Sequence, residues 1–398
     1  MERGHLWVAV IAGGQGTRLF PISHLERPKQ FCQLDEHNSF IQAATENFKS
    51  VGIKPTQMFV VTTNDNQLQL AKDQCLERGV LSQNIKEFNP SLGYAGSMIE
   101  AAKEIYAMDP EAIIINTPSD QYVDADDSFY VAIEDAVTAA KNGKAAIVCV
   151  KVNDIVTAMG CGHAVYDENS PGPCFRLTGE RFIEKPVREI ADKLMRQGNS
   201  AVNTGINVWK AKLIVDTFAN RDYVGIETDE LMDSFGDNIE VSVGTFKWRD
   251  CGTLKSLYEI SKKSANHKNV RLGGGTLEYD NCRNSLLYAG RGMNLRIYGA
   301  DGDAVIATSV NEKTIVVIAK LSDSQKIKLL AEDYYDHAEI LSDDFSMGAR
   351  NNMVLESNIS DEVVIGFVGV NKYAVYAHRE PNGEITIVVS QQLTTKTS

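Results

Sequence analysis

The sequence lacks a Cys-x-x-Cys pair, a long apolar run and a clean internal repeat. Its seven cysteines are scattered, so neither a zinc-binding module nor a disulfide scaffold is indicated. No apolar run reaches the roughly 20 residues that a membrane-spanning helix needs. No signal peptide precedes the first apolar run, and we therefore expect a protein of the reducing cytoplasm.

Positive charge is also in short supply. Lysine and arginine total 40, against 53 aspartate and glutamate residues, which gives a net charge of −13. A chain this acidic is a poor match for nucleic acid or for an anionic membrane surface. We therefore expect small-molecule partners, no nucleic acid and no membrane. Any phosphate site has to be a local cluster of cations and backbone N–H groups.

The first two thirds of the chain alternate between apolar runs and helical stretches. This pattern predicts an α/β fold whose Rossmann-like sheet is mainly parallel and covered on both faces. After about residue 266, short apolar runs separated by Gly, Asn and Asp replace the helical periodicity. We therefore predict a catalytic domain over 1–265 and a smaller β-rich domain over 266–398, either left-handed β-helix-like or a dimerisation module.

A glycine cluster directly follows the first apolar run, 6–11. Gly13, Gly14 and Gly16 let the backbone turn sharply and present its N–H groups to a ligand. Arg18 and Lys29 add two positive charges close behind. A buried strand, a glycine turn and two cations together predict a polyphosphate site, because ligands of such sheets bind at the carboxyl ends of the strands.

Two common phosphate motifs do not fit this loop. Neither Gly13 nor Gly14 begins the Gly-x-x-x-x-Gly-Lys-Ser/Thr run of a P-loop. Leu19 stands where the dinucleotide fingerprint requires a third glycine, which argues against a nicotinamide-dependent oxidoreductase. The glycines taken alone fit an ordinary strand-to-helix turn equally well.

The whole string is more specific than its glycines. Gly-Gly-x-Gly-Thr-Arg-Leu over 13–19, then Pro21 and the Pro-Lys-Gln-Phe run of 28–31, resembles the signature of the sugar-1-phosphate nucleotidyltransferases. The Pro-Lys-Gln-Phe ending is most similar to mannose-1-phosphate guanylyltransferases. The resemblance implies transfer of a nucleotidyl group from an NTP, with GTP favoured, to a sugar-1-phosphate, with mannose-1-phosphate favoured. Pyrophosphate is the second product.

The resemblance also implies the residues that hold the nucleotide and a metal. Arg18 and Lys29 are the implied catalytic cations. Asp120, after the strand-like run 113–116, and Asp250, in the Trp-x-Asp-x-Gly-Thr segment, are the implied ligands of Mg²⁺. The implied nucleotide-binding residues are Ala12, Gly13, Gly14, Gly16, Thr17, Gly93 and Ser119.

Three further segments resemble the family's sugar-phosphate site. Phe-Ile-Glu-Lys-Pro at 182–186 supplies Glu184 for sugar hydroxyls and Lys185 for the phosphate. Neighbours on a strand point to opposite faces, so only one of these two can face a pocket without a bulge. The Asn-Thr-Gly run supplies Asn203 and Gly205, and the Gly-Cys-Gly turn supplies Gly162.

One departure from the family leaves the substrates open. Leu92, Gly93 and Tyr94 stand where mannose-1-phosphate guanylyltransferases carry Arg, Asn and Thr, in the turn that reads the base. Tyr94 is expected to pack either on the base or on a neighbouring helix. A different sugar or base, or a catalytically silent regulatory subunit, therefore remains an alternative. We also expect a homo-oligomer, with a dimer favoured, and no isomerase activity, because the chain ends before the isomerase domain of bifunctional relatives.

Overall fold

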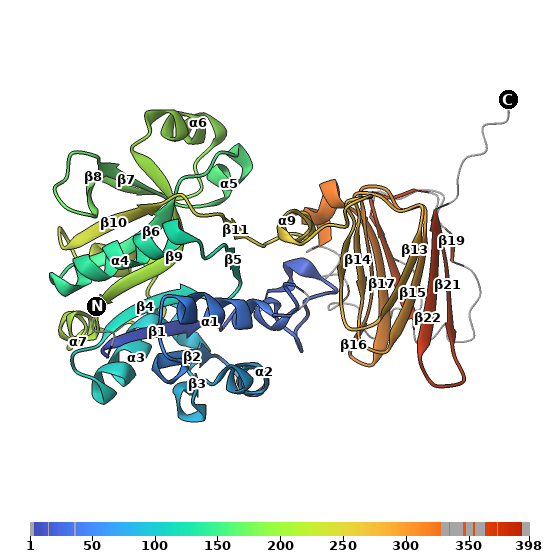
Figure 1. Cartoon of the computed structure of the whole chain (residues 1–398), viewed down its shortest axis with the longest axis horizontal. Helices are drawn as coiled ribbons and strands as arrows, with labels where there is room; N and C mark the ends of the chain where they lie inside the picture. Colours follow the sequence, from blue (N-terminus) through green and yellow to red (C-terminus); the bar gives the residue numbers. More distant parts are fainter. Residues whose placement is uncertain are drawn as a thin grey trace. The chain divides into compact units, whose positions relative to one another are not determined.

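The chain divides into two compact units, which are described separately (Figure 1). The computed structural model describes residues 4–14, 16–35, 37–327, 334, 345–347, 353–354, 363–371 and 373–391. The first unit comprises Met1–Gly13 and Phe40–Asp250, and the second comprises Gly14–Ser39 and Cys251–Ser398.

A nine-stranded sheet forms the centre of the first unit. Its strands, in spatial order, are β3 (Ile85–Glu87), β2 (Met58–Thr62), β1 (Leu6–Ile11), β4 (Ile113–Pro118), β9 (Ser200–Lys210), β6 (Ala145–Val150), β10 (Ile239–Gly244), β8 (Phe175–Ile183) and β7 (His163–Asp167). The first four strands are parallel, as the apolar runs predicted. Strands such as β1, which is buried almost throughout, suit a sheet covered on both faces.

The prediction of a mainly parallel sheet is nevertheless wrong for the other half. β9 runs antiparallel to both of its neighbours, β4 and β6. β7 and β8 form an antiparallel hairpin, and β8 pairs antiparallel with β10. Only β6 and β10 are parallel here. A short connection such as 168–174 can join antiparallel strands but is too short for a parallel crossover, so the sheet is mixed.

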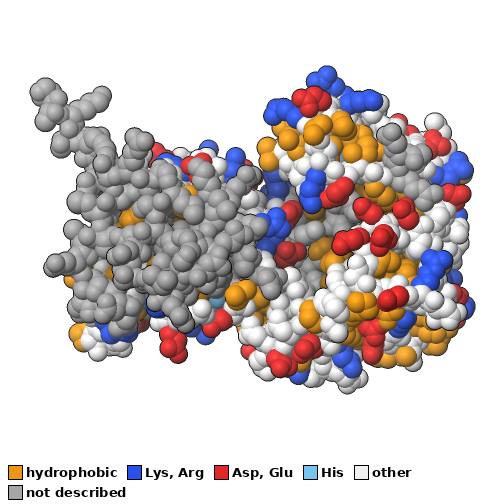
Figure 2. Space-filling view, turned by 180° about the vertical axis from the view of Figure 1, so that it is seen from behind, with side chains coloured by type: hydrophobic (Ala, Val, Ile, Leu, Met, Phe, Trp, Pro, Cys, Tyr) orange, Lys and Arg blue, Asp and Glu red, His pale blue; other side chains and the backbone are white. Residues whose placement is uncertain are grey.

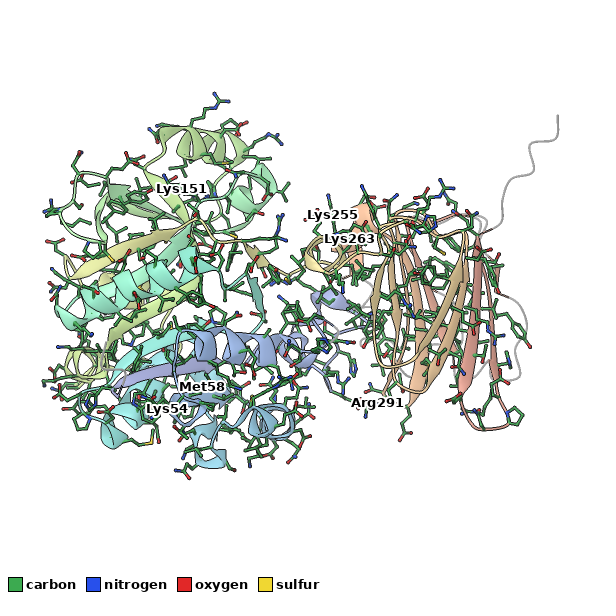
Figure 3. All side chains as sticks on the ribbon, viewed as in Figure 1. Lys54, Met58, Lys151, Lys255, Lys263 and Arg291 are labelled. Atoms are coloured by element: carbon green, nitrogen blue, oxygen red, sulfur yellow. The ribbon has the colours of Figure 1, made fainter. Side chains whose placement is uncertain are left out.

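Helices cover both faces of this sheet. They are α1 (Phe40–Ser50), α2 (Asp65–Cys75), α3 (Gly93–Met108), α4 (Asp127–Lys141), α5 (Ile155–Gly160), α6 (Arg188–Gln197), α7 (Ala211–Thr217) and α8 (Thr228–Asp233). Helices α3, α7 and α8 share one buried cluster with alternate residues of the sheet, such as Ala9 and Ile11. Helix α4 packs on β10 instead, where the Ser242 hydroxyl donates to the carbonyl of Ala132. Met58, at the start of β2, is fully buried (Figure 3).

Two sheets with a common core lie in the described part of the second unit. One contains β12 (Val270–Leu272), β14 (Leu286–Ala289), β16 (Asp303–Val310), β17 (Lys313–Lys320), β20 (Val363–Val368) and β18 (Phe345–Met347). The other contains β13 (Thr276–Asp280), β15 (Met293–Tyr298), β22 (Ile385–Gln391), β21 (Tyr373–Arg379) and β19 (Met353–Val354). Apolar residues of both sheets share one buried cluster, so the expected β-rich unit is present.

Consecutive strands from β12 to β16 alternate between these two sheets. Within each sheet, the neighbouring strands of this run are parallel. This is a feature of β-helices. The antiparallel pairs β16–β17 and β21–β22 break the repeat, and the latter turns at Glu380–Gly383. Helix α9 (Leu254–Ile260) leads into this unit.

The structural units do not follow the sequence-based boundary at 265/266. The second unit begins at Cys251 and also takes in the segment Gly14–Ser39. Within it, the Gly273 N–H donates to Gln33 Oε1 at 2.7 Å. The rings of Phe20 and Tyr334 lie 5.3 Å apart. These contacts attach the segment to the second unit, although it directly follows β1 in the sequence.

Candidate functional site

A two-stranded sheet brings the two predicted metal ligands together. β5 (Gln121–Val123) pairs antiparallel with β11 (Trp248–Asp250), and Asp250 stands opposite Gln121. Asp120 immediately precedes Gln121, so two residues that are 130 positions apart in the sequence lie at adjacent positions of the backbone, at one end of this ladder. Trp248 Nε1 donates to Gln121 Oε1 at 2.8 Å, which fixes this register.

A pocket of about 470 Å³ lies beside this ladder, and we call it the motif pocket. Its lining includes five of the residues predicted from sequence: Gly162, Glu184, Asn203, Gly205 and Asp250. The remaining lining residues are Tyr94, Pro118, Gln121, Cys161, Thr204, Glu227, Thr228, Asp229 and Trp248. The fold therefore gathers most of the predicted sugar-phosphate residues and one predicted metal ligand around a single opening in the first unit.

A bulge in β9 shapes one wall of the motif pocket. The register of β9 against β6 shifts between Ile206 and Asn203, which leaves Thr204 and Gly205 as extra residues. Gly205 has a φ of 76°, a left-handed conformation that glycine adopts without penalty. A Cβ at this position would lie 3.0 Å from Pro118 Cγ. The Gly205 N–H donates to Asn203 Oδ1 at 2.8 Å, so the two predicted sugar-binding residues hold one another in place.

The end of the β7–β8 hairpin forms a second wall. A Cβ on Gly162 would lie 2.5 Å from Glu184 Oε2, so only glycine lets this carboxylate approach so closely. Lys185 has a φ of 40°, and its Nζ pairs with Glu184 Oε1 at 3.0 Å. The left-handed backbone lets the lysine fold back toward the glutamate instead of alternating away from it, and Glu184 lines the pocket.

Strand alternation selects which side chains of β11 face the motif pocket. Trp248 and Asp250, two residues apart, both line it. Arg249 lies between them and extends elsewhere, because its Nη1 bonds Asp154 at 3.1 Å and Thr157 at 2.7 Å. The Trp-x-Asp spacing is therefore what places an aromatic ring and a carboxylate on the same side of one strand.

The start of the glycine loop leaves β1 beside the end of β4. Ile11 pairs with Pro118, and the Ser119 hydroxyl donates to the Ile11 carbonyl at 2.9 Å. The Ala12 N–H donates to the Val61 carbonyl at 2.8 Å. The Gly13 carbonyl accepts from Thr63 Oγ1 at 3.0 Å, and a Cβ there would lie 2.5 Å from Thr63 Cγ2. The Gly13 and Asp120 segments therefore start from adjacent strand ends.

The remainder of the glycine loop belongs to the second unit. The Gly14 carbonyl accepts from Gln30 Nε2 at 2.8 Å. Gly16 has a φ of 60°, and a Cβ there would lie 2.5 Å from the Cβ of Lys29. Arg18 is exposed on the short 3-10 helix Thr17–Leu19, whereas Lys29 is buried at the start of a second one, Lys29–Phe31. The side chain of Thr17 lies outside the described residues.

Burial and carboxylates together control the protonation of two groups in the motif pocket. Burial, with the nearby charges of Asp250 and Glu184, raises the pKa of the Cys161 thiol to about 12. Burial, with the charge of Asp120, also raises the pKa of the Tyr94 phenol. Both groups are therefore neutral at physiological pH. The Asp120 carboxylate is close enough to act on a residue that lines the pocket.

Comparison with known proteins identifies the family of the chain. The sequence profile described as nucleotidyl transferase matches residues 8–267. The chain belongs to the nucleotidyl transferase family.

Within that family, the relatives point to sugar-1-phosphate nucleotidyltransferases. The chain is 27% identical to Mannose-1-phosphate guanylyltransferase 2 of Escherichia coli O157:H7 over 85% of this chain and 77% of the relative. It is 24% identical to Mannose-1-phosphate guanylyltransferase of Sinorhizobium fredii over 82% of this chain and 68% of that protein. The protein is therefore a nucleotidyltransferase of the sugar-1-phosphate superfamily, and it resembles mannose-1-phosphate guanylyltransferases.

A solved structure supports the fold. The crystal structure titled mannose-1-phosphate geranyltransferase from Thermus thermophilus aligns with a TM-score of 0.65 at 21% identity. The alignment covers 83% of this chain and 99% of that one. At this identity the likeness concerns the fold, which is α/β with a β-rich part after the nucleotidyltransferase domain.

Sequence reasoning missed one wall of the motif pocket in this nucleotidyltransferase. Glu227, Thr228 and Asp229 line it from the start of helix α8. Their sequence signal is an acidic helix start, which is common wherever a helix begins. Gln121 was also missed, because only its pairing with Asp250 reveals its position. His163 does not line the motif pocket, and its Nε2 lies 2.7 Å from the Ala158 carbonyl oxygen.

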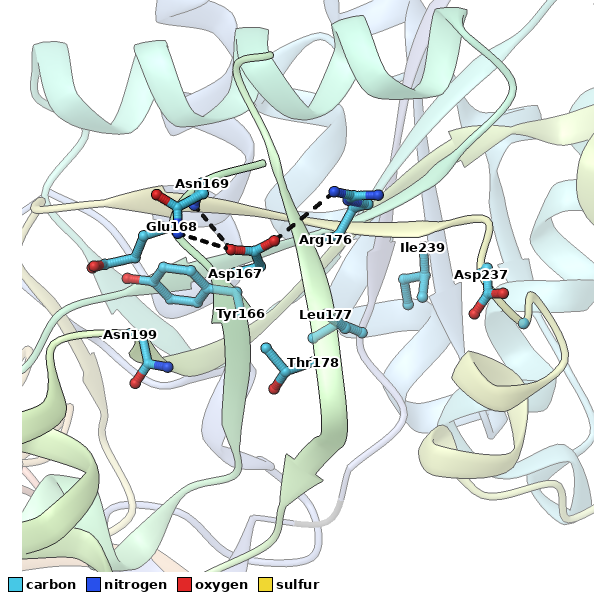
Figure 4. Close-up of a pocket in the computed structure, with 11 residues that line it drawn as sticks. Tyr166, Asp167, Glu168, Asn169, Arg176, Leu177, Thr178, Asn199, Asp237 and Ile239 are labelled. Atoms are coloured by element: carbon cyan, nitrogen blue, oxygen red, sulfur yellow. Dashed lines mark hydrogen bonds and ion pairs between the residues drawn. The ribbon is translucent and has the colours of Figure 1, made fainter. Parts of the chain in front are cut away.

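A second and larger opening of about 690 Å³ lies at the other end of the β7–β8 hairpin (Figure 4). We call it the hairpin pocket, and it is lined by Tyr166, Asp167, Glu168, Asn169, Arg176, Leu177, Thr178, Asn199, Gly236, Asp237 and Ile239. None of the predicted site residues is among them. Volume alone would therefore have drawn attention to the end of the hairpin that holds no residue predicted from sequence.

The described part of the chain contains no group of three or more His, Cys, Asp or Glu residues placed to hold a metal ion. Asp120 and Asp250 belong to segments that the β5–β11 sheet brings side by side, and two carboxylates would suit a cation held largely by its substrate. Within the described ranges, no helix is both long and apolar enough to cross a membrane. Charged side chains of both signs are interspersed on the face of the first unit seen in Figure 2.

Proposed function

We propose that the protein transfers a guanylyl group from GTP to mannose-1-phosphate, forming GDP-mannose and pyrophosphate. The names of the relatives and the Pro-Lys-Gln-Phe run of residues 28–31 support this choice of substrates. The observation that carries the proposal is the motif pocket, which gathers Glu184, Asn203, Gly205 and Asp250 around one opening.

The charges of the motif pocket favour a neutral sugar. Its lining contains four carboxylates, those of Glu184, Glu227, Asp229 and Asp250, and the described lining includes no lysine or arginine. Carboxylates accept hydrogen bonds from hydroxyl groups, so they suit a neutral, polyhydroxylated ring and disfavour an anionic one. Lys185 directly follows the pocket residue Glu184 in the sequence and forms an ion pair with it. We assign its ammonium group to the phosphate of the sugar-1-phosphate.

The proposed chemistry needs no dedicated general base. An oxygen of the sugar-1-phosphate attacks the α-phosphorus of the NTP, and pyrophosphate leaves. The attacking phosphate is already anionic near neutral pH, so the protein's task is to align two anions and neutralise the developing charge. We assign Ala12, Gly13, Gly14, Gly16, Thr17, Gly93 and Ser119 to the nucleotide, and Arg18 and Lys29 to the transition-state charge.

The carboxylates of Asp120 and Asp250 fit Mg²⁺, a hard cation that prefers oxygen ligands and is often held by one or two carboxylates together with substrate phosphates. The position of Asp120 directly before β5, whose first residue stands opposite Asp250, supports this assignment. When bound, the ion supplies Lewis-acid neutralisation of phosphate charge. We further propose a cytoplasmic homodimer that pairs through the β-rich unit. The names of relatives such as Alginate biosynthesis protein AlgA suggest that its product serves polysaccharide biosynthesis.

A substrate matrix tests the proposal. Purified protein with Mg²⁺ is incubated with each of GTP, ATP, UTP, CTP and dTTP against mannose-1-phosphate, glucose-1-phosphate and glucuronic acid-1-phosphate, and pyrophosphate release is followed. We expect the highest kcat/KM with GTP and mannose-1-phosphate, the lowest with the uronic acid, and loss of most turnover in an Arg18→Ala control. A different preferred pair would leave the family intact and correct the substrates. No release with any pair would instead favour the regulatory-subunit alternative.

A further inference from the structure

Tyr94 connects two parts of the enzyme that the family resemblance treats separately. It lies in the first turn of α3, in the segment that by resemblance reads the base. Its hydroxyl donates to the Gly205 carbonyl at 3.3 Å, across 111 positions of sequence. Its ring packs partly buried against the core, and the residue lines the motif pocket. The tyrosine therefore lies on the sugar side of the site.

The bond acts on the bulge that carries the proposed sugar-binding residues. The Gly205 carbonyl has a second donor, Asn207 Nδ2, at 3.0 Å. On its other side, Gly205 holds Asn203 through the N–H bond to Oδ1. Loss of the Tyr94 hydroxyl would thus affect Asn203 through one intervening residue, Gly205. The Gly205 carbonyl would still accept a hydrogen bond from Asn207, so the variant would not leave a buried acceptor without a donor.

We propose that Tyr94 is a positioning residue whose hydroxyl holds the Asn203–Gly205 bulge in the shape that accepts the sugar ring. It would then set the affinity for the sugar-1-phosphate and leave that for the NTP nearly unchanged. The inference rests on the proposed function only for the identity of the ligand. It also accounts for a tyrosine at a position where mannose-1-phosphate guanylyltransferases carry threonine.

The first unit offers a matched control. The Tyr166 hydroxyl donates to the Gly198 carbonyl at 3.2 Å, and Gly198, like Gly205, has a left-handed φ. This carbonyl too has a second donor, Lys151 Nζ, at 2.8 Å (Figure 3). Tyr166 belongs to the hairpin pocket and not to the motif pocket. Tyr166→Phe therefore removes the same kind of bond at a distance from the proposed sugar site.

The test compares Tyr94→Phe with Tyr166→Phe in steady-state kinetics. A neutral hydrogen bond of this kind corresponds to about a 2- to 10-fold change. We expect Tyr94→Phe to raise KM for the sugar-1-phosphate by that factor and to leave KM for the NTP and the melting temperature as in the control. An equal KM for the sugar-1-phosphate in both variants would overturn the inference. A rise in KM for the NTP alone would indicate that the tyrosine serves the base.

Hydrogen exchange provides a readout that does not depend on turnover. Peptides covering 200–208 should exchange faster in Tyr94→Phe than in wild type, and those in Tyr166→Phe should not. Unchanged exchange in Tyr94→Phe would overturn the positioning role whatever the activity. Absence of pyrophosphate release by wild-type protein would count against the proposed function, so the two failures are distinguishable.

Discussion

The motif pocket and the hairpin pocket lie at opposite ends of the same β7–β8 hairpin and share several features. His163 pairs with Ile183 at one end, and Asp167 pairs with Arg176 at the other. Each end carries an exposed ion pair, and each pocket includes a tyrosine that bonds a glycine carbonyl. Carboxylates line both pockets. An exposed ion pair, carboxylates and a tyrosine bonded to a glycine carbonyl therefore do not distinguish them.

The difference lies in how each pocket is built. The motif pocket draws on the end of β4, the β9 bulge, both strands of the hairpin end, the start of α8 and β11. A Cβ would come within 2.5 Å of Glu184 Oε2 at Gly162 and within 3.0 Å of Pro118 Cγ at Gly205. At the hairpin pocket, a Cβ on Gly198 would reach only Glu168 Oε1, at 4.0 Å. The motif pocket therefore differs from the larger opening in holding the motif residues that are far apart in the sequence.

The largest expected difference concerns the carboxylates of the two pockets. We expect Asp250→Asn to lower kcat about a hundredfold to a thousandfold, as loss of one preorganised charge contact does. Asp167→Asn should leave kcat unchanged. Pyrophosphate release at saturating substrates measures both, with circular dichroism to confirm folding. A folded Asp250→Asn protein within threefold of wild type would remove the motif pocket from the reaction.

The second largest difference is expected between the two ion pairs, in the KM for the sugar-1-phosphate. Glu184–Lys185 and Asp167–Arg176 are both exposed, with closest N···O distances of 3.0 and 3.9 Å, so neither contributes much to stability. Lys185→Gln should nevertheless raise KM for the sugar-1-phosphate about tenfold, the effect of losing one charged hydrogen bond. Arg176→Gln should not change it. Equal KM values in both variants would show that Lys185 does not meet the phosphate.

The two left-handed glycines are expected to differ less in stability than in activity. Alanine in a left-handed conformation costs roughly 1–2 kcal/mol at either site. Gly205→Ala adds the contact with Pro118 Cγ at 3.0 Å and should also raise KM for the sugar-1-phosphate several-fold. Gly198→Ala should lose stability only. Urea unfolding and steady-state kinetics test the pair, and normal kinetics in Gly205→Ala would argue against a role for the bulge.

The fold could be predicted only where local pattern decides it. The strands β1, β2, β4 and β6 follow from apolar runs bounded by helices. The antiparallel position of β9 between β4 and β6 does not follow from any apolar run. Strand order depends on packing between distant segments, which a local sequence pattern does not contain. The division of the chain also depends on tertiary contacts, such as Gln33 with Gly273, which attach the segment after the glycine loop to the second unit.

The candidate site shows the same limit. Glu184, Asn203 and Asp250 were found because each belongs to a motif of adjacent residues, and the fold brings them together. Gln121 has no such motif and acquires its place only through the ladder with β11. The link from Tyr94 to Gly205 spans 111 positions and is equally invisible to spacing rules. The roles of Arg18 and Lys29 remain predictions from sequence.

The smallest expected effect is a pH dependence of the free energy of unfolding that comes from His163, at the end of the hairpin beside the motif pocket. Burial lowers the pKa of His163, at the start of β7, below its ordinary 6.5. The unfolded chain therefore takes up this proton more readily than the folded one, so the contribution to stability is complete above about pH 6.5 and declines as the pH falls toward the folded pKa. Burial is the dominant cause, because the hydrogen bond between Nε2 and the Ala158 carbonyl oxygen acts in the opposite direction and raises the pKa.

Replacing this histidine isolates its contribution from the other titrating groups. His163→Gln keeps a polar side chain at the site but does not titrate, so it should lose less unfolding free energy than wild type between pH 7.5 and 5.5. Urea denaturation at each pH gives the two curves, and all other titrating groups, including His24, cancel in their difference. Parallel curves would mean that the folded and unfolded chains bind the His163 proton equally. Because His163 begins β7 directly after Gly162, which lines the motif pocket, a steeper wild-type curve would place the acid-sensitive end of the hairpin next to the proposed sugar site.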